Sequence, residues 1–114
     1  MTLALLALPF SCTGPTYDQR ILRAVGAEAR ALMAANPVNP AQPWVDIPEQ
    51  ALPPAIASLR PHDVTVYRWG VAITIKPFFD GGWGYEVPRK KGDFGMLPEC
   101  YSEVGPGVFW HGPC

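Results

Sequence analysis

The sequence lacks an excess of charge of either sign. Nine lysine and arginine residues are balanced by ten aspartate and glutamate residues, so the formal net charge of the 114-residue chain is −1. Domains that bind DNA or RNA concentrate basic side chains against the phosphates, so this composition excludes nucleic acid as an expected partner. The basic run Arg89-Lys90-Lys91 precedes Gly92-Asp93 in a stretch without apolar periodicity, and we interpret it as a solvated loop.

The chain also lacks an apolar stretch of the about twenty residues that a transmembrane helix needs. Residues 2–10 form a shorter apolar stretch that is similar to the core of a bacterial export signal. Ser11-Cys12 then resembles the cleavage site of bacterial lipoproteins, which makes Cys12 a candidate for lipidation. We expect a leader over residues 1–13 and a single domain over residues 14–114.

This leader predicts an exported, periplasmic or envelope-associated protein that meets a membrane only through an N-terminal anchor. The alternative is a cytoplasmic protein whose N-terminal segment packs on the core.

Cysteine is scarce, and its number is odd. Cys12, Cys100 and Cys114 cannot all pair within one chain. If Cys12 is removed or lipidated, Cys100 and Cys114 remain as a pair that can form a disulfide in an oxidising compartment. The alternative is three inert buried thiols.

Two helices are expected. Thr16 and Gln19 fit a capping box that starts the first helix, and Asn36-Pro37 ends it. The prolines between residues 37 and 48 favour an extended segment that covers the core. A second, short helix begins near Pro54. The apolar stripe of the first helix consists of Ile21, Leu22, Val25, Ala29, Leu32 and Met33.

Alternating apolar residues predict strands over residues 63–67 and 71–76, joined in an antiparallel hairpin by residues 68–70. A turn at Asp80-Gly81-Gly82 leads to a third strand that ends at Pro88, and residues 108–111 form a last strand. Residues 89–107 are expected to be a long loop with a short ordered piece near Tyr101. The sequence therefore predicts an α+β domain in which one long and one short helix pack on a three- to four-stranded antiparallel meander sheet.

The stretch from Ile47-Pro48 through residues 52–61 to Gly70-Val71, together with Phe109-Trp110, resembles a group of small uncharacterised bacterial proteins that are exported or lipoprotein-like. The similarity covers about half of the chain and rests on core and turn residues. It supports the expected fold and implies no activity.

Residues for catalysis are few. A Cys100 nucleophile with His111 as its base would suit a small hydrolase, but no activating motif surrounds them. Cys100, His111, Cys114 and His62 lack the spacing of a zinc site, and no loop has the pattern of a nucleotide site. We expect no metal and no cofactor. We expect a binding protein rather than an enzyme.

Aromatic residues near the turns are the most unusual feature of the sequence. Rings at turns are expected to reach the surface, where they can anchor a partner. We therefore expect a non-enzymatic binding or accessory module that presents aromatic loops to another protein. The alternatives are the hydrolase and a structural subunit of an oligomer. The candidate binding residues are Trp69, Phe78, Phe79, Trp83, Tyr85 and Trp110.

Overall fold

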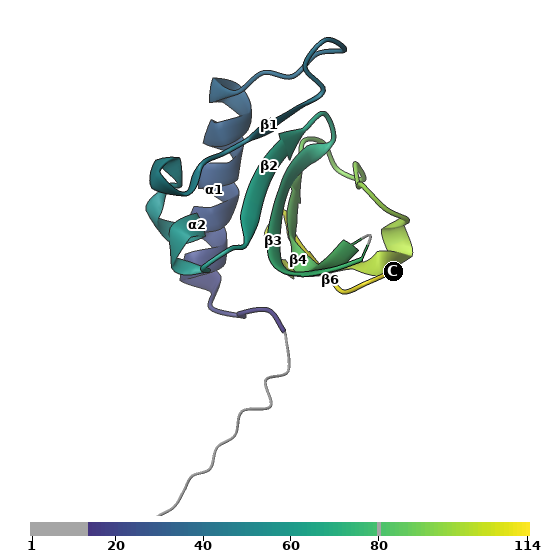
Figure 1. Ribbon diagram of the computed structural model, residues 1–114. Helices are drawn as coiled ribbons and strands as arrows, with labels where there is room; N and C mark the ends of the chain where they lie inside the picture. Colours follow the sequence, from purple (N-terminus) through teal and green to yellow (C-terminus); the bar gives the residue numbers. More distant parts are fainter. Residues whose placement is uncertain (1–13, 80) are drawn as a thin grey trace, which may run out of the picture.

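The computed structural model describes residues 14–79 and 81–114. The expected leader with Cys12, and Asp80 of the expected turn, lie outside the described residues. The predicted α+β class is confirmed: helices α1 (Gln19–Ala35) and α2 (Pro54–Ser58) lie on one side of a single antiparallel sheet (Figure 1). Two 3-10 turns, Glu49–Ala51 and Pro98–Cys100, complete the regular structure.

The sheet has six strands rather than the expected three to four, in the order β1-β2-β3-β4-β6-β5. Two strands were not predicted. β1 is part of the proline-containing segment, which pairs with β2 through its backbone, and β5 replaces most of the ordered piece expected near Tyr101. The order also departs from a meander at its end, because β4 pairs with β6 and β5 takes the edge. The strands are β1 (Trp44–Asp46), β2 (Asp63–Tyr67), β3 (Gly70–Phe78), β4 (Gly81–Pro88), β5 (Tyr101–Gly105) and β6 (Val108–His111).

Helix α1 begins differently from its prediction. Asp18, not Thr16, is the N-cap: its carboxylate accepts hydrogen bonds from the backbone N–H groups of Arg20 and Ile21. The Gln19 side chain donates to the carbonyls of Tyr17 and of Val104 in β5, at 3.1 and 2.9 Å, and not to Thr16. The expected capping box is therefore wrong, because Gln19 finds a tertiary partner instead. The expected end at Asn36 is confirmed.

The core lies between α1 and the sheet. Leu22, Val25 and Ala29 of the predicted stripe are fully buried, and they pack in one cluster with the apolar residues of the strands. Burial of this face stabilises the helix against the cost of Gly26 in its interior. The strand residues in the cluster include Val64, Val66, Val71, Ile73 and Val87.

Helix α2 is held by a carboxylate from α1. The two oxygens of Glu28 accept hydrogen bonds from the backbone N–H groups of Ala55 and Ile56, at 3.0 and 2.9 Å. A helix of five residues has little stability of its own, so this contact and the buried Ile56 fix its position.

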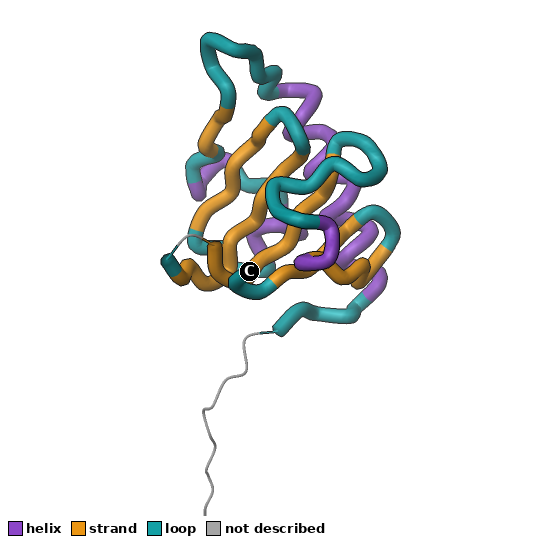
Figure 2. Tube along the Cα trace, turned by 90° about the vertical axis from the view of Figure 1, so that its right-hand side faces the viewer, coloured by secondary structure: helices purple, strands orange, loops and turns teal. Residues whose placement is uncertain are grey.

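The opposite face of the sheet is covered as well. Figure 2 views the sheet from the side opposite the helices and shows a loop crossing in front of the strands. This is the segment of residues 89–100, which runs from the end of β4 to the start of β5. Its Phe94 stacks on Tyr101 at 4.3 Å between ring centroids and meets Phe109 edge to face. A small second core results on this side.

Candidate functional site

Three of the six candidate aromatic residues gather at the tip of the β3–β4 hairpin. The ring centroids of Phe78 and Phe79 lie 4.6 Å apart, and those of Phe78 and Trp83 lie 5.7 Å apart, both in edge-to-face geometry. The Nζ atom of Lys76 lies 5.3 Å from the Trp83 ring centre, within range of a cation–π contact. We call Phe78, Phe79 and Trp83 the aromatic tip.

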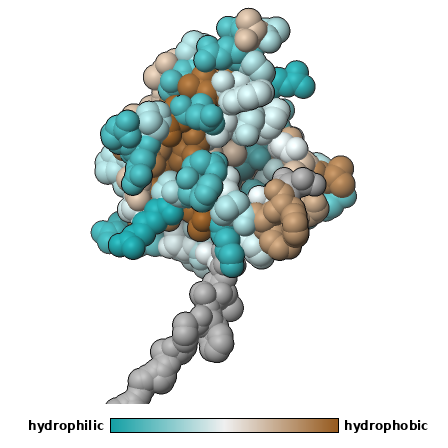
Figure 3. Space-filling model, in the orientation of Figure 1, coloured by the Kyte–Doolittle hydropathy of each residue, from teal (hydrophilic) through white to brown (hydrophobic). Residues whose placement is uncertain are grey.

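The tip is exposed to an unusual extent. Phe79 is 93% exposed and Phe78 is 46% exposed. In Figure 3 a lighter brown patch lies at the lower right of the molecule, at the end of the sheet where β3 and β4 meet, apart from the darker brown surface farther to the left. The backbone at Phe79 has φ 48°, in the left-handed region that a bulky side chain rarely occupies. Gly82 is required opposite Pro77 in this hairpin, because a Cβ atom at Gly82 would collide with the Lys76 carbonyl.

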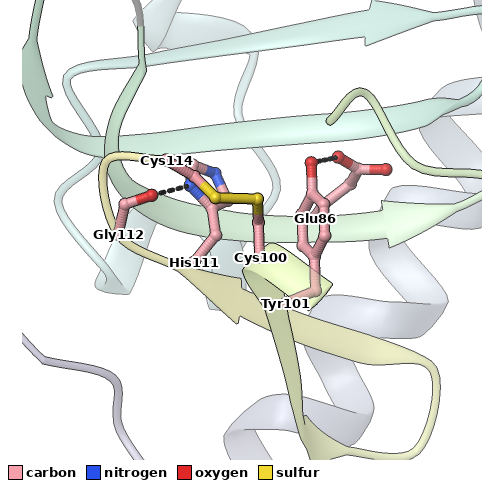
Figure 4. Close-up of a disulfide and its surroundings, with 6 residues drawn as sticks. All are labelled: Glu86, Cys100, Tyr101, His111, Gly112 and Cys114. Atoms are coloured by element: carbon pink, nitrogen blue, oxygen red, sulfur yellow. Dashed lines mark hydrogen bonds between the residues drawn. A yellow bond between two sulfur atoms is a disulfide. The ribbon is translucent and has the colours of Figure 1, made fainter. Parts of the chain in front are cut away.

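The C-terminal residues support one side of the tip. Phe78, Phe79, Gly81, Pro113 and Cys114 line a shallow hollow of about 330 Å³. The predicted pairing of Cys100 with Cys114 is confirmed: a disulfide joins them across 14 positions, with Cα atoms 6.0 Å apart (Figure 4). The bond therefore ties the last residues, and with them one wall of the hollow, to the start of β5.

Trp69 lies at the other end of β3, away from the tip. It occupies the two-residue turn between β2 and β3, and its ring stacks on Tyr67 with centroids 4.5 Å apart. The expected three-residue loop is one residue shorter, since Gly70 pairs with Tyr67. Gly70 is needed there because a Cβ atom at this position would collide with the Val87 carbonyl.

Tyr85 and Trp110 form a separate pair on neighbouring strands. Their rings meet edge to face at 4.9 Å. Tyr85 is only 3% exposed, and its hydroxyl accepts a hydrogen bond from the Thr16 backbone N–H at 2.8 Å. Burial raises the pKa of this hydroxyl above its ordinary value. Tyr85 thus packs in the core and holds the residues before α1, whereas Trp110 is half-buried beside it.

The groups expected for hydrolysis do not form an active pair in this structure. Cys100 is bonded to Cys114 and so carries no thiol, the group that would attack a substrate. The His111 Nδ1 atom lies 3.1 Å from the Gly112 carbonyl, and its ring contacts Tyr101 (Figure 4).

Glu86 is the most buried carboxylate among the described residues, and the sequence did not indicate its burial. It is 2% exposed beneath the 89–100 segment. Its Oε1 atom accepts a hydrogen bond from the Tyr101 hydroxyl at 2.8 Å (Figure 4). The same atom accepts a second one from the Gly95 N–H at 3.3 Å. Its buried Oε2 atom has no partner among the described residues.

The surroundings raise the pKa of both Glu86 and Tyr101. Burial raises the pKa of the Glu86 carboxyl, although the hydrogen bonds from Tyr101 and Gly95 oppose the shift. Burial and the nearby Glu86 carboxylate raise the pKa of the Tyr101 hydroxyl. The Tyr101 proton therefore stays on its oxygen and bonds to Glu86 throughout the physiological range. An acidic residue between Tyr85 and Val87 in a buried strand was the only signal in the sequence for this contact.

Within residues 14–79 and 81–114, no three histidine, cysteine, aspartate or glutamate side chains gather as a metal site requires. No helix in this part of the chain is both long and apolar enough to cross a membrane. Comparison with known proteins found no matching family model, no matching curated protein and no matching solved structure.

Proposed function

We propose that this chain is a binding module that docks on a protein partner through its aromatic tip, and that it works outside the cytoplasm. The observation that carries the proposal is Phe79: a ring 93% exposed at the end of a hairpin, on a backbone with φ 48°.

The fold gains little from this ring. A left-handed backbone costs about 1–2 kcal/mol for a residue with a side chain, and glycine would avoid that cost at the same position. Burial of a phenylalanine side chain stabilises a complex by about 1.5–3 kcal/mol. Phe79 can recover its cost only when something else covers it. This favours a surface that is completed by a partner.

The side chains at the aromatic tip indicate what kind of surface the partner presents. The rings present edges and faces suited to an apolar pocket, which is how aromatic anchors dominate protein interfaces. Lys76 adds one positive charge beside Trp83. A matching surface would therefore have an apolar pocket for Phe79 with an acidic residue at its rim.

Two observations support a location outside the cytoplasm. The Cys100–Cys114 disulfide is stable in oxidising compartments and rare in the cytosol. The apolar stretch of residues 2–10 is similar to an export signal, in keeping with the small exported bacterial proteins that the sequence resembles.

A photo-crosslinker placed at Phe79 in the producing cell tests the docking surface. Tyr17 is the matched control, since it is also an aromatic residue and is 69% exposed away from the tip. We expect a discrete protein adduct from position 79 that position 17 does not form. The same adducts from both positions would contradict the proposal.

Two other products would also overturn it. Crosslinking of position 79 to phospholipid would make the tip a membrane-contacting element. Crosslinking to a second copy of the chain would favour the structural subunit of an oligomer.

A further inference from the structure

A second hollow, of about 440 Å³, lies at the opposite end of β3 from the aromatic tip. It opens between the β2–β3 turn and the start of the 89–100 segment. Its charged lining residues are Arg68, Arg89, Lys90 and Asp93, and its aromatic ones are Trp69 and Phe94. We call it the cationic cleft.

The charge of the cleft contrasts with that of the whole chain. It holds three of the nine basic residues and one of the ten acidic ones, which leaves six basic and nine acidic residues elsewhere. In the described part of the chain the only ion pair joins His62 and Asp63. Arg68, Arg89 and Lys90 thus line one hollow together with Asp93, and none of the three forms an ion pair with a described carboxylate.

The cleft is also held in shape before anything binds. The Arg89 backbone N–H donates to the Trp69 carbonyl at 2.7 Å. The Arg89 guanidinium donates to the carbonyls of Arg68 and Tyr67, at 2.9 and 3.1 Å. These bonds fasten the two walls together and fix one cation, so little side-chain freedom remains to be lost on binding.

The aromatic wall is fixed in the same way. One contact is the stack of Trp69 on Tyr67. The other is with Gly95, where a Cβ atom would lie 2.7 Å from the indole Nε1. Only glycine allows this close approach, so the indole has a defined position at the edge of the cleft.

We propose that the cationic cleft binds a small aromatic carboxylate. Guanidinium groups form paired hydrogen bonds with carboxylates, and Arg68 and Lys90 supply donors that no described carboxylate engages. Trp69 and Phe94 offer apolar surface for a flat ring. The volume lies within the range of small-molecule sites.

This site is independent of the aromatic tip. β3 separates the two over its nine residues, a length of about 26–30 Å at the rise of an extended strand. Loss of either site therefore leaves the other intact.

Titration of the full chain with naphthoate, followed by amide and indole NMR signals, tests the proposal. We expect saturable shifts at Trp69 and at residues 90–94. Neutral naphthamide should bind at least about tenfold more weakly than naphthoate, since it lacks the charge. Arg68→Gln and Lys90→Gln should each weaken naphthoate binding about tenfold. Arg89 is left unchanged because it fastens the turn.

Lys91→Gln is the matched control, because Lys91 belongs to the same basic run and does not line the cleft. It should bind naphthoate as the unaltered protein does. Equal affinity for naphthoate and naphthamide, equal weakening by Lys91→Gln and Lys90→Gln, shifts confined to the aromatic tip, or no saturable shift would each overturn the proposal.

Discussion

Replacing Glu86 with glutamine should change how the stability of the protein depends on pH. Burial raises the pKa of the Glu86 carboxyl above its ordinary 4.5. The folded state therefore binds this proton more tightly than the unfolded state does. The stability that the bound proton contributes is fully present below the unfolded pKa and is lost as the pH rises through the raised folded pKa. At neutral pH the charged Glu86 is a cost to the fold.

The magnitude follows from the contacts of the carboxylate. Each unit by which the folded pKa exceeds the unfolded one corresponds to about 1.4 kcal/mol. Glu86→Gln keeps an oxygen to accept from Tyr101 and Gly95 while removing the charge, so it should stabilise the fold at neutral pH. Glu86→Ala leaves the Tyr101 hydroxyl and the Gly95 N–H without their acceptor. Each of these donors that stays buried should lower the unfolding free energy by about 1–3 kcal/mol.

Tyr101→Phe provides an independent check. The hydrogen bond from Tyr101 lowers the pKa of Glu86, so its loss should raise that pKa further and steepen the fall in stability with pH. Glu99→Gln is the matched control for Glu86→Gln, because Glu99 is an exposed glutamate in the 89–100 segment that covers Glu86.

The assay is urea unfolding, followed by tryptophan fluorescence, at several pH values from about 4.5 to 8. We expect the unfolding free energies of the unaltered protein and Glu86→Gln to diverge as the pH rises, with Glu86→Gln the more stable. Parallel profiles would refute the reasoning, because they would mean that Glu86 titrates alike in the folded and unfolded states.

Two further predictions concern contacts that hold the fold. Glu28→Ala should lower the unfolding free energy by about 1–3 kcal/mol in urea, because it removes both hydrogen bonds to α2; a loss no larger than that of Arg23→Ala on the exposed side of α1 would speak against it. Cys114→Ser should cost about 3 kcal/mol by loop-closure entropy, because the disulfide spans 14 positions, and reductant should reproduce the loss in the unaltered protein. If reductant left the urea midpoint unchanged, the bond would not stabilise the domain.

Local sequence patterns predicted the elements whose structure is determined by their own residues. The hairpin of β2 and β3 follows from alternating valines and isoleucines around a tight turn. Helix α2 was predicted from a proline in its first turn, and β6 was predicted as well. The disulfide was predicted on the condition that Cys12 is removed or lipidated, which leaves Cys100 and Cys114 as a pair.

Elements that depend on distant partners were missed. β1 and β5 are the two edge strands of the sheet, and each exists because its backbone pairs with one neighbour. Pairing of that kind leaves little trace in a three- or five-residue sequence. The Asp18 cap was missed because Gln19 engages Val104, 85 positions away, instead of Thr16.

The candidate site was predicted in part for a similar reason. Turn positions correctly indicated exposure for Phe78 and Phe79, but alternation alone could not show that Tyr85 is buried. Alternation places Glu86 on the side of β4 opposite Tyr85 and Val87, but it could not show that this side is buried as well. The 89–100 segment covers that side, and a covering loop has no periodicity from which to predict it.

Calorimetric titration of the partner captured at position 79 tests the central proposal most directly, with three proteins compared: the unaltered chain, Phe79→Ala and Tyr17→Ala. An anchoring aromatic residue contributes about 2 kcal/mol or more, so Phe79→Ala should weaken binding about thirtyfold, while Tyr17→Ala should bind normally. A folded Phe79→Ala protein that binds the partner as tightly as the unaltered chain would contradict the proposal.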